Sequence, residues 1–226
     1  EIIPAGGVWN TRIYNTWFGL SQSKFGCFIE PSGSGVVDGI TFTGCEFTDN
    51  GDCGLIVNGS GAKNWSVTGG HSGGNTNSGI RAAGGTTDFT ITGHRAGNIA
   101  GRGVNNVGIT VDAAASDRYS VSGCNLLGNT SGGLVDLGTG TNCMVVDNLG
   151  YNGASSVIGL TVGASPWGYT AGHTPETIYV LGGTVSDVKI DGNTVQNATA
   201  CTIQLMPNET MSITYSVLPT VLRKRN

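Results

Sequence analysis

The chain has 226 residues, of which 39 are glycine, and only 12% of its residues are charged. This composition excludes a protein built from surface helices, and the regular recurrence of Val, Ile, Phe, Trp and Tyr excludes a disordered chain. A net charge of −4 argues against duplex nucleic acid as a partner, and the sequence has no apolar run of about 18 residues that could span a membrane. We therefore expect an all-β protein.

The first part of the chain is rich in aromatic residues and precedes a regular repeat. The chain starts at Glu1 without Met or a signal peptide, which we interpret as the start of a fragment or a processed product. Residues 26–30 resemble a strand of the repeat, so one less regular coil comes first. The aromatic residues around it either cap a stack of coils or mark a junction with a preceding region; they are Trp9, Tyr14, Trp17, Phe18, Phe25 and Phe28.

Five short segments of similar sequence then follow at intervals of 25, 24, 30 and 25 residues. They are residues 40–44, 65–69, 89–93, 119–123 and 144–148. In the first four, the first and third residues are large and apolar, whereas the second and fourth are Thr or Ser. Because side chains alternate along a strand, each segment is predicted to be a strand with one apolar face and one hydroxyl face.

Two other residue types keep a constant distance from these strands. Fourteen residues after each strand start comes a glycine that is predicted to open a second strand: Gly54, Gly79, Gly103 and Gly133. Ten residues after the start comes an asparagine, with one member a place early: Asn50, Asn75, Asn98 and Asn129. A unit of this length cannot cover its own apolar face, so copies must stack, with asparagines bonded from coil to coil. The pattern predicts a right-handed parallel β-helix of about five to six coils over residues 1–157.

The third unit is about five residues longer than the others. We place the surplus between Gly103 and Tyr119, around residues 108–112, and expect a loop there, because insertions in repeats map to one, often functional, face. Asp136 falls at a position that should face inward. This indicates either a buried, hydrogen-bonded carboxylate or a slip in the assigned register.

After Tyr151 the repeat stops. Residues 158–226 hold alternating segments broken by Gly-Gly, Asp-Gly and Pro, which predicts a small antiparallel β-sandwich-like module of four to six strands. Residues 223–225 are basic and are expected to form a solvated tail, with a polyanion-binding patch as the alternative. The six cysteines match no zinc pattern and are expected to be reduced and mostly buried. We predict no metal site and no cofactor.

The motifs of this C-terminal module resemble those of a known family. They are the segments SPWGYT at 165–170, GGTV at 182–185, LMP at 205–207, and TY at 214–215 followed by PT at 219–220. The pattern is similar to the terminal module of tail-fibre and tailspike proteins of bacteriophages and prophages, where it follows a pectate-lyase-like β-helix. The resemblance implies a homotrimer whose C-terminal module helps assembly, with a bacterial surface glycan, capsule or lipopolysaccharide, as the target. It also implies a virion tail protein, made in the host cytoplasm, that joins other tail proteins through a missing N-terminal region.

One corner of the first aligned coil could carry glycoside hydrolase or lyase chemistry. Glycosidases need two carboxylates, about 5 Å apart in retaining enzymes and about 6.5 to 9.5 Å apart in inverting ones. Glu46, Asp49 and Asp52 crowd this corner and are the candidate catalytic residues. His71 and Arg95 share the offset of Glu46 in the next coils, so the three would form a polar column able to bind a sugar or abstract a proton. Favourable pairing of outward polar residues is the alternative explanation.

Asp112, Asp117 and Arg118, beside the predicted loop, form the second candidate site, in which Asp112 and Arg118 are the predicted glycan-binding residues. The alternative there is a turn with a surface ion pair. The sequence therefore leaves three functions: a tail-fibre or tailspike-type receptor-binding protein, a polysaccharide depolymerase on the same helix, and an ice-binding or adhesive protein that uses the Thr-x-Thr face. Since depolymerase grooves usually run along helices of more than five or six coils, we expect binding rather than cleavage.

Overall fold

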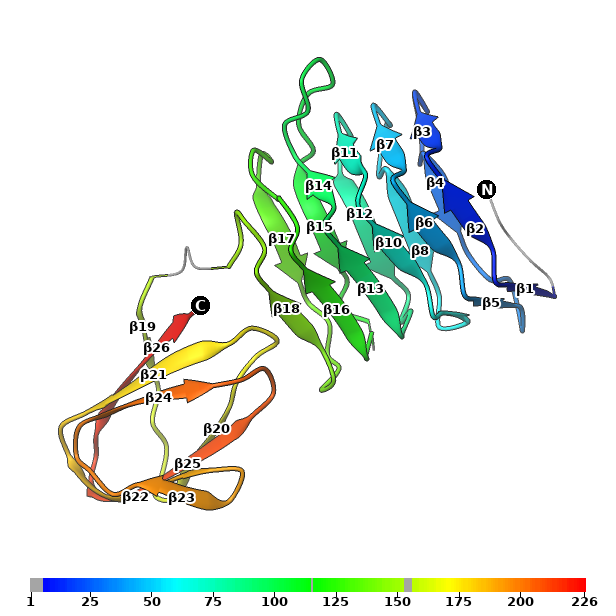
Figure 1. Ribbon diagram of the computed structural model, residues 1–226. Coiled ribbons are helices and arrows are strands. Elements are labelled where there is room, and N and C mark those ends of the chain that lie inside the picture. Colours follow the sequence, from blue (N-terminus) through cyan, green and yellow to red (C-terminus); the bar gives the residue numbers. More distant parts are fainter. Residues whose placement is uncertain (1–5, 115, 153–155) are drawn as a thin grey trace. The chain divides into compact units, whose positions relative to one another are not determined.

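The computed structural model describes residues 6–114, 116–152 and 156–226 (Figure 1). The chain divides into two compact units. The first extends to Cys143 and includes Asp147–Tyr151, and the second consists of Met144–Val146 and Asn152–Asn226. In the described ranges every regular element is a strand, and no helix is present that could cross a membrane.

The first unit is a parallel β-solenoid of about six turns, as the repeat predicts (Figure 1). Its strands form four parallel sheets, three of which supply the faces used below. One sheet contains β2 (Arg12–Tyr14), β6 (Thr41–Thr43), β10 (Ser66–Thr68), β13 (Phe89–Thr92) and β16 (Tyr119–Ser122). The next consists of β3 (Trp17–Gly19), β7 (Glu46–Thr48), β11 (His71–Gly73) and β14 (Arg95–Ala96).

The third sheet consists of β4 (Cys27–Ile29), β8 (Leu55–Asn58), β12 (Ser78–Ala83), β15 (Val107–Val111) and β17 (Gly132–Asp136). A short fourth sheet contains β1 (Gly7–Trp9), β5 (Val36–Asp38) and β9 (Ala62–Lys63). Strand β18 (Met144–Val146) coincides with the fifth predicted repeat segment. The predicted pairing of residues 26–30 with the second-strand position is confirmed, because Cys27 pairs with Leu55.

The core of the solenoid is built from the apolar positions that alternation assigns to the interior. Phe42, Val67 and Ile91 are at most 1% exposed and lie in register on neighbouring strands. The rings of Trp65, Phe89 and Tyr119 stack with centroid distances of 4.5 and 4.8 Å, which is the rise of about 4.8 Å that parallel strands impose on successive coils. The repeat of large apolar residues thus becomes a continuous column inside the solenoid.

A ladder of asparagines runs through the interior corner between the second and third sheets. The prediction that Asn98 belongs to it is wrong. The Nδ2 of Asn50 donates to the Oδ1 of Asn75 at 2.9 Å, Asn75 to Asn105 at 2.7 Å, and Asn105 to Asn129 at 3.1 Å. The third coil therefore contributes Asn105. Asn98, the predicted member, is exposed.

The insertion of the third coil lies earlier than predicted. Fourteen positions separate Arg95 from Ile109, whereas nine separate the equivalent His71 and Ile80, so the five extra residues fall between them. Residues 108–112 belong to or directly follow β15, whose Gly108 takes the position of Gly79. The constant offsets from the strand start predicted Gly103 and Asn98 for the third coil, because the inserted loop is itself rich in Gly and Asn and supplies these residues near the expected positions.

The aromatic residues of the first coil lie in three environments, so they do not form one cap. Phe18 stacks on Phe47 inside the solenoid at 5.3 Å. Trp9, Tyr14 and Trp17 are 62%, 55% and 46% exposed. Phe25 and Phe28 stack on each other and pack against a small cluster that contains Ile56.

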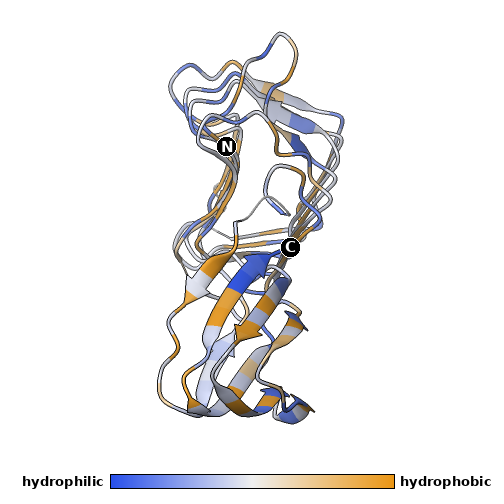
Figure 2. Ribbon diagram, turned by 90° about the vertical axis from the view of Figure 1, so that its left-hand side faces the viewer, coloured by the Kyte–Doolittle hydropathy of each residue, from blue (hydrophilic) through white to orange (hydrophobic). Residues whose placement is uncertain are grey.

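The second unit consists of two four-stranded antiparallel sheets around one core, as its alternating sequence predicts (Figure 2). One sheet has the order β19 (Ile158–Leu160), β26 (Thr220–Arg225), β21 (Glu176–Leu181) and β24 (Cys201–Leu205). The other has the order β20 (Trp167–Thr170), β25 (Thr210–Val217), β22 (Thr184–Ile190) and β23 (Asn193–Gln196). These eight described strands exceed the predicted four to six because short polar strands such as β23, which is exposed along its length, lack an apolar pattern.

The basic C-terminal residues are part of the second unit rather than a solvated tail. Arg223 lies on β26, and its Nη1 is 3.4 Å from Oε1 of Glu176, whose side chain is fully buried. The hydroxyl of Tyr169 donates to the other carboxylate oxygen at 2.5 Å. Burial and this carboxylate raise the pKa of Tyr169 to about 12, so the phenol remains a donor.

Candidate glycan-binding face

Four exposed or half-buried side chains form one outward column across the sheet β3-β7-β11-β14. Trp17 pairs with Glu46, Glu46 with His71, and His71 with Arg95, each on the neighbouring parallel strand. Asn125 continues the column through a bridge to Arg95. The structure therefore brings Glu46, His71 and Arg95 together as the spacing predicts. We call Trp17, Glu46, His71 and Arg95 the outer column.

The charges of the outer column remain accessible to solvent. Oε2 of Glu46 lies 3.4 Å from Nε2 of His71, and these side chains are 42% and 29% exposed. The Nη2 of Arg95 donates to the carbonyl of Asn98 at 2.9 Å, and among the described residues no carboxylate pairs with it. Since exposed ion pairs contribute about 0 to 1 kcal/mol to folding, this column adds little stability and is free to contact a ligand.

Trp17 is a member of the outer column that the sequence pattern missed. Its Nε1 donates to the Oγ1 of Thr48 on the neighbouring strand β7 at 2.8 Å, while 46% of the residue stays exposed. The guanidinium of Arg102 lies over the ring, 5.5 Å from its centroid, in a cation–π contact. The available signal was that Trp17 stands at the offset of Glu46 in the irregular first coil.

The inserted loop of the third coil reaches back beside the outer column. Nη1 of Arg102 forms an ion pair with Oδ2 of Asp49 at 2.9 Å, two coils earlier. The backbone of Gly74 leaves room for this return, because a Cβ there would lie 2.1 Å from the carbonyl oxygen of Arg102. A Cβ on Gly73 would likewise lie 2.7 Å from Ile99. The loop is therefore fixed along one side of the sheet by two glycines and one ion pair.

The three predicted catalytic carboxylates have separate partners. Glu46 contacts His71, Asp49 contacts Arg102, and Asp52 accepts a hydrogen bond from the Cys53 thiol at 3.3 Å. Burial raises the pKa of this thiol to about 11, so it is a donor at neutral pH. A catalytic role of Glu46, Asp49 and Asp52 remains a prediction.

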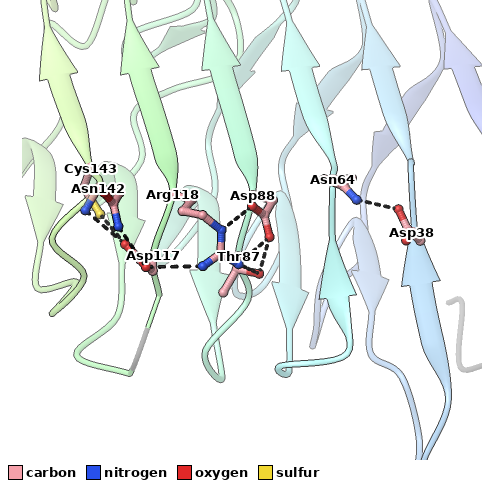
Figure 3. A network of polar contacts seen from close by, with 8 residues as sticks. All are labelled: Asp38, Asn64, Thr87, Asp88, Asp117, Arg118, Asn142 and Cys143. Atoms are coloured by element: carbon pink, nitrogen blue, oxygen red, sulfur yellow. Dashed lines mark hydrogen bonds and ion pairs between the residues drawn. The ribbon is translucent and has the colours of Figure 1, made fainter.

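Asp112 and Arg118 lie on other parts of the solenoid. Asp112 follows β15 and accepts hydrogen bonds from Nε and Nη2 of Arg81, the shortest at 2.8 Å. Arg118 lies at the corner before β16, where its Nε and Nη2 donate to Asp88 (Figure 3). Hydrogen bonds from Arg118 lower the pKa of Asp88. The five predicted glycan-binding residues thus occupy three places, and only Glu46, His71 and Arg95 form one face.

The corner that holds Arg118 is a continuous polar network (Figure 3). Asp117 lies 3.3 Å from Arg118 and accepts from the backbone and side chain of Asn142 in the next coil. Arg118 has a φ of 51°, a conformation that disfavours side chains with a Cβ, and Asp88 and Asn64 share it at the equivalent corner. These contacts make Arg118 part of a brace that joins neighbouring coils at this corner.

Asp136, which the sequence places at an inward position, and His94 both point into the solenoid. Asp136 accepts a hydrogen bond from the Tyr119 hydroxyl at 2.6 Å, so it is a hydrogen-bonded carboxylate in the assigned register. His94 is fully buried between the carbonyl of Gly69, at 2.8 Å, and the hydroxyl of Ser72, at 3.1 Å. Burial lowers the pKa of His94 to about 4. Within the described residues no group of His, Cys, Asp or Glu could hold a metal ion.

The hydroxyl face of the solenoid has the register required by the Thr-x-Thr pattern. Thr43, Thr68, Thr92 and Ser122 form one outward column, and Thr41, Ser66, Thr90 and Ser120 form the other. Arg12 and Tyr14 begin these columns in the first coil. Comparison of the chain with models of protein families and with curated proteins found no match.

Proposed function

We propose that the protein is a receptor-binding part of a phage tail fibre or tailspike and that it recognises a bacterial surface polysaccharide, capsule or lipopolysaccharide. The observation that carries the proposal is the outer column, in which an exposed indole is followed on successive coils by a carboxylate, an imidazole and a guanidinium. The parallel solenoid and the antiparallel second unit are compatible with such a protein.

The chemistry of the outer column suits a sugar chain. A sugar ring has one face of C–H groups, which packs on the negative face of an aromatic ring, and hydroxyl groups that pair with planar polar side chains. Trp17 offers the aromatic surface, and Glu46, His71 and Arg95 offer acceptors and donors at intervals of about 4.8 Å along the stack. A polymer with a regular repeat can therefore contact several coils at once.

The proposal includes a homotrimer that joins other tail proteins in the virion. Its oligomeric state is tested by native mass spectrometry of the purified protein. Three chains in one particle support the fibre assignment, whereas a stable monomer argues against it and in favour of a monomeric adhesive or ice-binding protein. Measurement of thermal hysteresis then decides on ice binding.

The outer column is tested by binding to capsular polysaccharides and lipopolysaccharides from a panel of Gram-negative bacteria. Trp is enriched among the few interface residues whose truncation costs about 2 kcal/mol or more, so Trp17→Ala should weaken binding by about thirtyfold if Trp17 anchors the glycan. Tyr14→Ala is the matched control, because Tyr14 is at least as exposed as Trp17 but lies on the hydroxyl face. Binding that survives both Trp17→Ala and Arg95→Gln would place the site elsewhere.

The same incubation separates binding from cleavage. We expect no new reducing ends and no unsaturated products. If the native protein forms products and Glu46→Gln, Asp49→Asn or Asp52→Asn does not, the protein is a depolymerase that acts at this corner. Products that persist in all three variants would show cleavage at another site.

A further inference from the structure

A cavity of about 260 Å³ lies on the outside of the first coil, apart from the outer column. It is lined by Ser21, Lys24, Phe25, Gly26 and Phe28, which come from β4 and the loop before it. Ligand pockets for drug-sized molecules span about 300 to 1,000 Å³, so this volume suits one small ring rather than a chain. Neither the repeat nor the outer column explains why an aromatic cavity should exist here.

The apolar side of the cavity is a packed pair of phenyl rings. Phe25 and Phe28 stack with centroids 5.0 Å apart and an interplanar angle of 26°. They pack on Cys53, Ile56 and Ala83, which are at most 6% exposed although they lie outside the solenoid core. In the next two coils the position equivalent to Ile56 holds Arg81 and then Thr110, which are the polar residues expected on a solvated face. The two rings are half-buried, so they form a firm surface with one side open.

The loop that supplies the polar side is fixed to the second coil. The amide of Ser21 donates to Oδ1 of Asn50, at one end of the asparagine ladder. The carbonyl of Lys24 accepts from the amide of Asp52 at 3.0 Å, and the amide of Gly26 donates to the carbonyl of Cys53 at 3.1 Å. The cavity is therefore held in shape before any ligand arrives, which lowers the entropic cost of binding.

Lys24 supplies an uncompensated positive charge at this cavity. Its side chain is exposed, and among the described residues no carboxylate forms an ion pair with it. Lys63 and Lys189, by contrast, pair with Asp38 and Asp187. In a chain of net charge −4 an unpaired lysine beside an aromatic cavity is a specific feature that an anionic ligand group would complete.

We propose that this cavity binds a single sugar residue that carries a carboxylate. The C–H face of the sugar ring packs on Phe25 and Phe28, the carboxylate pairs with Nζ of Lys24, and the Ser21 hydroxyl bonds a ring hydroxyl. The inference rests on the proposed function, because it assigns an acidic sugar to the glycan that the protein recognises. It also adds a second contact region on the same first coil.

The test follows the backbone amide signals of Ser21, Lys24, Phe25 and Gly26 by NMR during titration with acidic monosaccharides. The probes are glucuronate, galacturonate and N-acetylneuraminate, each with its methyl ester as a neutral control of the same shape. We expect shifts of these signals with at least one acid and much weaker shifts with its ester. Lys24→Gln should raise the Kd of that acid by about tenfold, as expected for a charge-assisted hydrogen bond.

Arg12→Gln is the matched control, since Arg12 is another exposed cation of the first coil without a carboxylate partner among the described residues, and it should leave the Kd unchanged. Equal binding of acid and ester, an unchanged Kd in Lys24→Gln, or no shift with any of the three acids would overturn the proposal. Trp17→Ala tests only the outer column. If this variant loses polysaccharide binding while no acid shifts the amide signals of the cavity, the proposed function stands and this inference fails.

Discussion

His94 is a buried, neutral imidazole whose protonation opposes folding. Its pKa is lowered from 6.5 to about 4 by burial, whereas the unfolded chain keeps the ordinary value. The unfolded state therefore binds a proton between these pH values and the folded state does not. The corresponding stability is fully present above pH 6.5 and is lost as the pH falls toward 4.

We predict that the free energy of unfolding falls by about 3 kcal/mol between pH 7 and pH 4 because of His94 alone. Denaturant unfolding of the native protein and of His94→Gln over this range measures it, and the variant should lose most of the slope. An NMR titration that shows the His94 ring protonating near pH 6.5 would refute this prediction without any variant.

Glu176 is the buried charge of the second unit, and Arg223 compensates it. The Arg223 side chain is 16% exposed and that of Glu176 is fully buried, so removal of Arg223 would leave the carboxylate with the Tyr169 hydroxyl and the more exposed Arg225, whose Nε lies 3.6 Å away. We predict that Arg223→Met lowers the free energy of unfolding by about 3 kcal/mol. Lys224→Met, on the next position of β26, should change it by less than about 0.5 kcal/mol in the same denaturation experiment. If the two variants change the free energy of unfolding equally, the contact between Arg223 and Glu176 does not stabilise the fold.

At the scale of elements, the asparagine ladder joins the coils through side chains in addition to the backbone pairing of the sheets. Asn105 has no exposed surface; its Nδ2 donates to the carbonyl of Ser72 and to Asn129, and its Oδ1 accepts from Asn75. We predict that Asn105→Ala destabilises the first unit by about 2 to 4 kcal/mol, because several buried groups lose their partners together.

Asn98→Ala is the informative control for the ladder. Asn98 lies in the inserted loop with its side chain exposed, so its replacement should have little effect on thermal unfolding. A larger loss of stability in Asn98→Ala than in Asn105→Ala would mean that the third coil is bonded as the simple repeat suggests. The comparison therefore tests the register of the insertion directly.

At the scale of the whole molecule, each unit has its own hydrophobic core. Ile178 is fully buried in the core of the second unit, among Val180, Val188 and Ile213. Ile178→Ala should cost about 2 to 5 kcal/mol. We predict that hydrogen exchange then accelerates in β21, β24 and β26, while β6, β10 and β13 of the solenoid keep native rates. Acceleration of similar size in both units would show that the chain unfolds as one cooperative body.

Much of the solenoid was determined by the amino-acid sequence itself. Inward residues such as Phe42, Val67 and Ile91, and the stack of Trp65 on Phe89, follow from period-two alternation repeated at constant spacing. The column of Glu46, His71 and Arg95 follows from the same spacing, because parallel in-register stacking converts equal offsets into neighbours. Wherever the period holds, position in the sequence gives position in space.

Where the period fails, only the tertiary structure decided the outcome. The insertion shifted the third coil, so the place of Asn105 in the ladder could be found only from hydrogen bonds between coils. The contact of Arg102 with Trp17 and Asp49 joins residues more than fifty positions apart through a loop without a repeat. The cavity beside Lys24 depends on how Phe25 and Phe28 pack against Ile56. These features arise from packing between segments distant in sequence, and local pattern carries no information about such contacts.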